Sequence, residues 1–345
     1  MSDASALPEV DPVTPEHVPP TTKRRVLGLV GALFAFVLVV NFGTLALLHA
    51  RPANRSQWLT VEKWKLIDTA PDADTIIVGD STCNQGVRPD LLGQELGGTV
   101  INLCTTRGLM VLNDEWMVEA WLRKHHGLKR IVVVHTYDIW QHGLINNFLL
   151  TLGTYPQPWG FWEDFRQPLH LDTGEKALVA AGRWFPMYSD QRSLEEYLAH
   201  PQRVFKKDFK LQPDGFMDWK QADPKGVHHD AKLHFQRLGE PWVGADINGD
   251  SLATLVKLAA ENHLELTLAP APMFEGVWND PRMPARYKQI HDWIHAHFPA
   301  APGAYDIQDP PLTFPDTQME NVDHVVGDAA ITYTKWLAAQ IKAHH

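Results

Sequence analysis

The sequence contains few cysteines, no long basic run and no internal repeat, and each of these absences excludes a class of protein. Two cysteines in 345 residues cannot make a four-ligand zinc site or a disulfide framework, although they can form one bridge. With a formal net charge of −10 and no basic run beyond Lys23–Arg25, the chain is not expected to bind nucleic acid. The lack of a repeat argues against solenoid and propeller folds. What remains is a globular composition, 44% hydrophobic and 21% charged.

Charge is also missing from one long segment near the N-terminus. Residues 26–48 are apolar and uncharged, and about 20 such residues suffice to cross the hydrocarbon core of a bilayer. A cleavable signal peptide has an apolar core of only ~7–15 residues, so we predict an uncleaved transmembrane anchor helix. Because Lys23–Arg25 precede it, the positive-inside rule places the N-terminus in the cytoplasm. We therefore expect a single-pass protein of the cytoplasmic (inner) membrane whose main domain is extracytoplasmic, which in a bacterium means periplasmic.

The segments on either side of the anchor define the remaining organisation. Residues 1–25 are rich in proline and acidic residues, and we interpret them as a disordered cytoplasmic tail. Residues 49–70 are predicted to be a linker and juxtamembrane segment, and residues 71–345 a single domain.

Apolar runs and amphipathic patterns alternate in this domain. The runs are continuous, which is typical of strands that are buried on both faces of a parallel sheet. The alternation predicts an α/β fold in which helices cover both faces of that sheet. The predicted strands are residues 75–78, 99–103, 130–134 and 264–269, and the predicted helices are residues 113–124, 251–262 (with Ser251 as N-cap) and 328–342.

Residues 141–248 interrupt this alternation. The segment is too long for a simple loop and is rich in proline, glycine and histidine. Two interpretations are open: a cap over the functional site, or an irregular insertion with a small core of its own. The segment contains five tryptophans, which are Trp159, Trp162, Trp184, Trp219 and Trp242.

Polar residues follow three of the predicted strands, at the edge where an open parallel sheet binds its ligands. Ser81 follows the first strand, Gly108 the second, and His135–Asp138 the third. His324 lies shortly before the last predicted helix, which can return it to the same edge. These residues can therefore meet in one site.

This set contains the groups that an acyl-transfer site requires. Ser81 can supply a hydroxyl nucleophile and His324 a general base, while Asp323 or Asn321 can orient the imidazole. The backbone N–H groups of Ser81 and Gly108 can stabilise an oxyanion. Each signal is common when taken singly, and it is their order and placement along the chain that favour a site.

Further polar residues near this edge are candidates for contacts with a substrate. Arg88 and Arg107 flank the proposed site and can hold an anionic group, or they can form surface ion pairs with carboxylates. Asp138 and His135 are candidates for the same role. The remaining histidines show no known zinc spacing, so we expect neither a metal nor another cofactor.

These motifs resemble those of the SGNH (GDSL-like) hydrolase superfamily. They are most similar to the membrane-anchored SGNH proteins of polysaccharide O-acetylation, which are related to the alginate O-acetyltransferase accessory proteins and the D-alanine-transfer protein of teichoic acids. The resemblance covers roughly residues 70–140 and 250–340. It is carried by Gly79-Asp80-Ser81 with Gly86 and Pro89, by Asn102–Gly108, by Ala269–Pro272, and by Asp323-His324 before the last helix.

The resemblance implies a three-layer α/β/α flavodoxin-like fold, with Ser81 as nucleophile and His324 as base. It also implies an acyl-enzyme intermediate, a polysaccharide or lipid-linked glycan substrate, and a membrane-bound O-acyltransferase as partner. We therefore expect an O-acyltransferase that moves acetyl groups to or from a cell-surface or secreted polysaccharide. Two alternatives are open: a non-catalytic partner that docks a membrane-bound O-acyltransferase and binds glycan, and a carbohydrate or lipid esterase.

The chain departs from the family pattern at two points. Asn321 stands where the family usually has an aspartate, three residues before the histidine, so either Asn321 or the adjacent Asp323 must orient His324. His135–Asp138 stands where the family has a Gly-x-Asn-Asp pattern with an asparagine that donates to the oxyanion. The predicted oxyanion hole therefore lacks one of its usual donors.

The two cysteines fall near the proposed nucleophile. Cys83 lies two residues after Ser81, and Cys104 follows the second predicted strand, so both are expected at the same edge of the sheet. We hypothesise a disulfide between them that braces the nucleophile turn, with two buried free thiols as the alternative.

Overall fold

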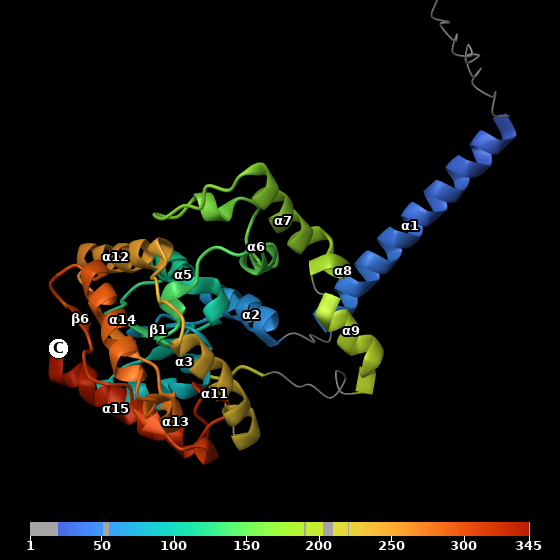
Figure 1. The fold of residues 1–345 in the computed structure, drawn as a ribbon. Coiled ribbons are helices and arrows are strands. Elements are labelled where there is room, and N and C mark those ends of the chain that lie inside the picture. The colour runs from blue at the N-terminus through green and yellow to red at the C-terminus, as the bar shows by residue number, and fades with distance from the viewer. Residues whose placement is uncertain (1–19, 51–54, 190, 203–209, 220, 345) are drawn as a thin grey trace, which may run out of the picture. The chain divides into compact units, whose positions relative to one another are not determined.

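The computed structural model describes residues 20–50, 55–189, 191–202, 210–219 and 221–344, and the chain divides into two compact units, Met1–Ala50 and Arg51–His345. The first unit contains the helix α1 (Pro20–Ala50) (Figure 1). Its segment Arg24–Leu47 is long and apolar enough to cross a membrane, a property that N-terminal signal sequences share. The predicted anchor lies within α1, but the helix begins at Pro20, so the end of the predicted tail is helical. Residues 1–19 lie outside the described part of the chain.

The second unit is built around a five-stranded parallel sheet with strand order β2-β1-β3-β4-β6. The α/β class and the four predicted strands are confirmed, with ends that differ by at most one residue. The fifth strand was not predicted, because it has only three residues and no apolar run. The strands are β1 (Thr75–Gly79), β2 (Val100–Asn102), β3 (Arg130–His135), β4 (Glu265–Pro270) and β6 (Ala304–Asp306), and a separate two-stranded sheet pairs β5 (Met273–Phe274) with β7 (Thr313–Phe314).

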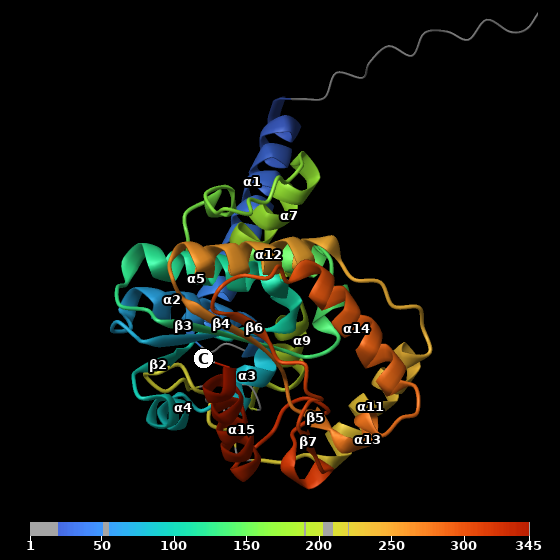
Figure 2. The same ribbon diagram turned by 90° about the vertical axis from the view of Figure 1, so that its left-hand side faces the viewer.

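Helices pack on both faces of the five-stranded sheet (Figure 2). One face carries α5 (Met110–Lys124), α12 (Asp246–Glu261) and α14 (Met283–His297), and the other carries α4 (Pro89–Leu96) and α15 (Asp328–His344). The remaining described helices are α2 (Arg55–Thr69), α3 (Ser81–Gly86), α6 (Asn146–Leu152), α7 (Thr173–Trp184), α8 (Pro186–Ser189), α9 (Gln191–Ala199), α11 (Pro224–Leu238) and α13 (Glu275–Trp278), with short 3-10 helices η1 (Arg107–Leu109), η2 (Ile139–Gln141), η3 (Phe161–Glu163) and η4 (Asp316–Gln318).

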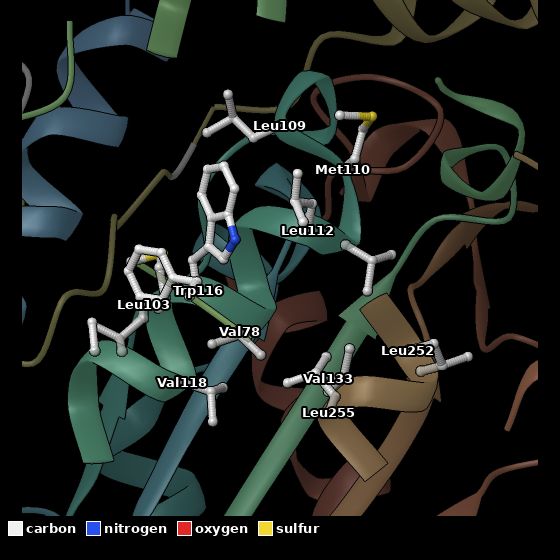
Figure 3. Packing of buried hydrophobic residues seen from close by; sticks show 14 of the residues in the cluster. Val78, Leu103, Leu109, Met110, Leu112, Trp116, Val118, Val133, Leu252 and Leu255 are labelled. Carbon is white, nitrogen blue, oxygen red and sulfur yellow. The ribbon is translucent and has the colours of Figure 1, made fainter. Parts of the chain in front are cut away.

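The apolar strands contribute side chains to two hydrophobic cores, one on each face of the sheet, because successive side chains of a strand point to opposite faces. In β1, Val78 belongs to the core under α5 and α12, whereas Ile77 belongs to the core under α15. Figure 3 shows the first of these cores, with Val78 and Val133 of the central strands near Leu252 and Leu255 of α12. The continuous apolar character of the strands therefore reflects burial on two faces, as predicted.

Two predicted boundaries need correction. Ser251 is not an N-cap, because α12 already begins at Asp246 and the Ser251 hydroxyl donates to the Ile247 carbonyl within the helix. The predicted linker over residues 49–70 includes the helix α2, whose residues Leu59 and Trp64 are buried in the domain core. The domain therefore begins with α2, while residues 51–54 lie outside the described part.

In its described residues, the insertion at 141–248 consists of helices joined by turns and loops, and its aromatic part does not form a separate core. Phe161 packs edge-on against both Trp64 and Trp116, and Phe165 stacks on Trp116 with ring centroids 5.5 Å apart. These rings belong to the same core as the sheet. At its other end, the insertion supplies α11, which contacts α13 and η4 near the carboxyl edge of the sheet. The interpretation as an insertion with its own core is therefore wrong for the aromatic part.

Candidate active site

Ser81 is the first residue of α3, directly after the carboxyl end of β1. The preceding Asp80 is the N-cap, and its Oδ1 accepts hydrogen bonds from the Thr82 N–H (2.9 Å) and the Thr82 hydroxyl (2.6 Å). Gly79 has φ +145°, and a Cβ there would lie 2.0 Å from the Val134 carbonyl oxygen, so the tight turn requires glycine. This turn leaves Ser81 partly exposed while the rest of α3 is buried.

His324 lies in a turn that brings both candidate orienting residues to its ring. The Asn321 Oδ1 accepts hydrogen bonds from the backbone N–H groups of Asp323 (3.1 Å) and His324 (3.0 Å). The same oxygen lies 2.7 Å from the His324 Nδ1, and the Asp323 Oδ1 lies 2.5 Å from that nitrogen. Neighbouring side chains on an extended chain would point apart, so it is the turn made by Asn321 that allows Asp323 to reach the ring.

These contacts assign the tautomer of His324. Its Nδ1 faces two acceptor oxygens, so Nδ1 must carry the proton and the Nε2 of the neutral ring must hold the lone pair. His324 is 6% exposed, and its Nε2 has no hydrogen-bond partner within the described residues. The ring is therefore arranged to accept a proton at Nε2.

The charges around this histidine favour its protonated form. Burial of the ring lowers the pKa of His324, but the carboxylate of Asp323 outweighs burial and raises the pKa above its usual value. Burial raises the pKa of Asp323, but the charges of His324 and Arg107 outweigh burial and keep this pKa below its usual value. The Arg107 Nη1 lies 3.6 Å from the Asp323 carboxylate. A carboxylate thus supports the imidazolium that a general base forms.

Direct contacts join α3 to the histidine turn, although these segments lie far apart in the sequence. The Gln85 Nε2 donates to the Glu320 Oε2 (2.9 Å) and to the Val325 carbonyl (3.5 Å). Within the described residues, no hydrogen bond joins the Ser81 hydroxyl to the His324 Nε2. Catalytic hydrogen bonds are often long in unliganded enzymes and tighten when substrate binds. The structure thus brings the two segments together without forming the bond between nucleophile and base.

The two predicted oxyanion donors follow adjacent strands. Ser81 begins α3 after β1, so its backbone N–H belongs to the unpaired first turn of a helix. Gly108 lies exposed in η1 after β2, with open space around the position of a Cβ. Met110, which follows η1 and begins α5, has the strained combination of φ 61° and ψ 178°. Such strain is common at functional sites.

The predicted substrate-binding arginines are engaged with carboxylates. The Arg107 Nη1 lies 3.2 Å from the Asp138 Oδ2, and the Nη1 of Arg237 on α11 lies 3.1 Å from the same oxygen. Arg88 pairs with Asp90 on the surface (2.7 Å). Both predicted arginines therefore form ion pairs with carboxylates, which was the stated alternative to binding an anion, while their side chains stay 39% (Arg107) and 35% (Arg88) exposed. Arg237 was not predicted, since only the fold brings the insertion to this edge.

His135 and Asp138 do not face the solvent as the prediction of substrate contacts required. They are 3% and 1% exposed. The His135 Nε2 lies 2.6 Å from the Asp114 Oδ2, and its Nδ1 lies 3.5 Å from the Asp80 Oδ2. Burial lowers the pKa of His135, but Asp114 and Asp80 outweigh burial and raise it to about 9. Asp114 and Asp80 therefore hold His135 behind the nucleophile turn, and neither of these two carboxylates was predicted as a site residue.

Cys83 of α3 and Cys104 after β2 form a disulfide, which is the pairing hypothesised from the sequence. The bridge joins the nucleophile helix to the loop that leads to Gly108. The alternative of two buried free thiols is thereby excluded in the structure, since the described residues hold no free cysteine.

We expect the double replacement of Cys83 and Cys104 by serine to lower the free energy of unfolding by roughly 3 kcal/mol, because the bridge closes a loop with a sequence separation of 21. Denaturant unfolding of the full chain in detergent measures this difference. Wild-type protein that has been reduced should unfold at the same midpoint as the variant. Equal midpoints for the oxidised wild type and the variant would show that the bridge adds no stability.

Comparison with known proteins does not assign the chain to a family: no family model and no curated protein matches it. Within the part of the chain that the structure describes, no group of three or more His, Cys, Asp or Glu side chains is arranged to hold a metal ion. Any function must therefore be argued from the site itself.

Proposed function

We propose that this protein is a membrane-anchored, extracytoplasmic O-acyltransferase of the SGNH (GDSL-like) type. Ser81 attacks an acyl ester, His324 takes the hydroxyl proton at Nε2, and the acyl group passes to Ser81. The protonated His324 then returns the proton to the leaving alcohol. In the second step, His324 takes the proton of a polysaccharide hydroxyl, which attacks the acyl-Ser81 ester, and the proton returns to the Ser81 oxygen as the acyl group leaves it. Acetyl is the acyl group proposed here.

The single observation that carries this proposal is the arrangement at His324. A buried imidazole with its Nδ1 held by Asp323 and Asn321, and its Nε2 unpartnered within the described residues, is organised as a base. The helix α3, which begins with Ser81, is bonded to the turn that carries this base through Gln85. The Nδ1 of the buried His135 also lacks a hydrogen-bond partner within the described residues, so it is the fixed Nδ1 proton, held by Asp323 and Asn321, that distinguishes His324.

The sheet supports the family part of the proposal. Numbered along the sheet's own strands, the order is 2-1-3-4-5, which is the flavodoxin-like order of doubly wound folds. Ligands of such sheets bind at the carboxyl edge, next to the point where the strand order reverses. In this chain that point lies between β1, which ends at Gly79 two residues before Ser81, and β3, which ends at His135.

The proposed location outside the cytoplasm is supported by two features. The α1 segment is long and apolar enough for an anchor, and basic residues precede it. The Cys83–Cys104 bridge fits an oxidising compartment such as the periplasm. A membrane-bound O-acyltransferase that delivers the acyl group, and a polysaccharide or lipid-linked glycan that receives it, are the partners proposed with this location.

A second function is favoured by one observation. The hydrogen bond between the Ser81 hydroxyl and the His324 Nε2 is absent within the described residues. A non-catalytic protein that docks a membrane-bound O-acyltransferase and binds glycan would not need this bond. Such a protein should act in cells even when Ser81 and His324 are replaced.

Incubation of the full chain in detergent with p-nitrophenyl acetate and an oligosaccharide separates these functions. The proposed acyltransferase should acetylate the oligosaccharide faster than it releases acetate to water. Release to water alone would identify an esterase. If the wild type and Ser81→Ala form equal amounts of acetylated oligosaccharide and equal amounts of free acetate, the catalytic proposal is wrong.

A further inference from the structure

A buried polar network links α2 to the nucleophile helix α3. Its two central residues are Lys63 on α2 and Asn102 at the end of β2, and both are fully buried. Neither belongs to the proposed reaction chemistry. Burial of an ammonium group is costly unless hydrogen bonds compensate for it, so the contacts of Lys63 need a reason.

Lys63 uses all its donors on backbone and amide oxygens. Its Nζ lies 2.7 Å from the Asn102 carbonyl oxygen, 2.9 Å from the Asn102 Oδ1 and 2.7 Å from the Gly215 carbonyl oxygen. Three acceptors require three N–H donors, so this geometry belongs to the ammonium form. Burial lowers the pKa of Lys63 well below its usual value, although Asp214 opposes this effect. With every donor engaged, Lys63 has no group left for a ligand or for catalysis.

Asn102 links Lys63 to the nucleophile helix α3. Its Nδ2 donates to the carbonyl oxygens of Cys83 (2.8 Å) and Val87 (3.3 Å), which lie within and directly after α3. Its Oδ1 also accepts the backbone N–H of Cys104 (3.0 Å). Asn102 therefore contacts the backbone of both disulfide cysteines, and its amide donates to α3 with the nitrogen while it accepts from Lys63 with the oxygen.

Asp214 and Gly215 of the insertion also contact this network. The Asn102 N–H donates to the Asp214 carbonyl (2.8 Å), next to Gly215. Gly215 has φ +84°, and a Cβ there would lie 2.1 Å from the Asn102 carbonyl oxygen. Glycine is therefore required for the chain to reach Lys63 and Asn102 so closely.

We propose that Lys63 and Asn102 are positioning residues that fix α3, and with it Ser81, at the carboxyl edge of the sheet. The first helix after the apolar segment α1 is then part of the scaffold of the active site. This inference rests on the proposed function only in naming Ser81 as the nucleophile. The mechanical part of the inference, that Lys63 and Asn102 hold α3 in place, stands without it.

The test compares three variants of the full chain in detergent. Asn102→Asp keeps the oxygens that face Lys63 and Cys104 but removes the donors to Cys83 and Val87. Lys63→Met removes the ammonium and keeps a long apolar side chain. Lys65→Met is the matched control, because Lys65 lies on the exposed side of the same helix and pairs only with Glu62 within the described residues.

Hydrogen exchange of the peptide that covers residues 81–86 is the first readout. We expect Asn102→Asp and Lys63→Met to speed exchange in this peptide by at least about tenfold, while Lys65→Met leaves it unchanged. Peptides of β3 and α12 should keep their wild-type rates in all three variants. Wild-type exchange in α3 of Asn102→Asp, or equal acceleration in every peptide, would overturn the inference. If Lys63→Met does not fold, Asn102→Asp decides the question.

Turnover of p-nitrophenyl acetate is the second readout. A displaced nucleophile should lower kcat by about tenfold or more in both network variants with KM changed less than about twofold, because misplacement acts on the reaction step. Unchanged kcat together with faster exchange in α3 would refute the link to Ser81. If the wild type shows no turnover, the proposed function fails, whereas the exchange measurement still decides whether the network positions α3.

Discussion

Replacing Ser81 with alanine is expected to lower kcat/KM for p-nitrophenyl acetate by at least about 10³-fold, because the acyl-enzyme cannot form without the hydroxyl. The substitution removes one oxygen from a partly exposed position at the start of α3, so the fold should survive. Thermal unfolding of the variant should match that of the wild type. This match separates loss of chemistry from loss of structure.

Ser189 provides the control for this substitution. It lies at the end of α8, and its hydroxyl contacts only the Phe185 carbonyl within the described residues. Ser189→Ala should retain wild-type kcat/KM. If Ser81→Ala also retains it, the reaction does not pass through Ser81.

The second large effect is expected at His324 and appears as a change in pH dependence. The base acts when its ring is neutral, and the pKa of His324 is raised above its usual value because Asp323 outweighs burial. The pH–rate profile should therefore have a rising limb, and the apparent pKa of this limb should lie above the usual histidine pKa of about 6.5. His324→Ala should lower the maximal rate by roughly 10²–10⁴-fold, the usual contribution of a general base.

Asp323→Asn tests the cause of this shift. Removing the carboxylate leaves burial as the main influence on the ring, so the limb should move to lower pH than in the wild type. Asn321 still contacts Nδ1, so the ring should keep its orientation in part and the variant should retain more activity than His324→Ala. A pH profile of kcat/KM measures both effects. A limb that stays in place would show that Asp323 does not set the pKa of the base.

The sequence predicted the elements whose pattern follows directly from burial. β1, β3 and β4 are continuous apolar runs because both faces of the sheet are covered. β6 was not predicted because Ala304–Asp306 is short and ends in a charged residue. The signal for α2 was present in the sequence, since Leu59, Trp64 and Ile67 share one face of a helix, but the segment was interpreted as a linker.

The site was predictable where chain order and strand ends determine it. Ser81 and His324 could be proposed because parallel strands end at one edge and the last helix can return the chain there. The choice between Asn321 and Asp323 could not be made, because it depends on a turn in which both reach the ring. Asp114 and Arg237 were missed because their contacts depend on how α5 and α11 pack.

The most direct test of the central claim is to trap the acyl-enzyme. Full-length protein would be mixed with p-nitrophenyl acetate, quenched in acid within the first turnover, digested and analysed by mass spectrometry. We predict an acetyl group on the peptide that contains Ser81, with slower accumulation in His324→Ala and none at this site in Ser81→Ala. An acetylated product formed by wild-type protein with no acetyl group on Ser81 at any time would contradict the account.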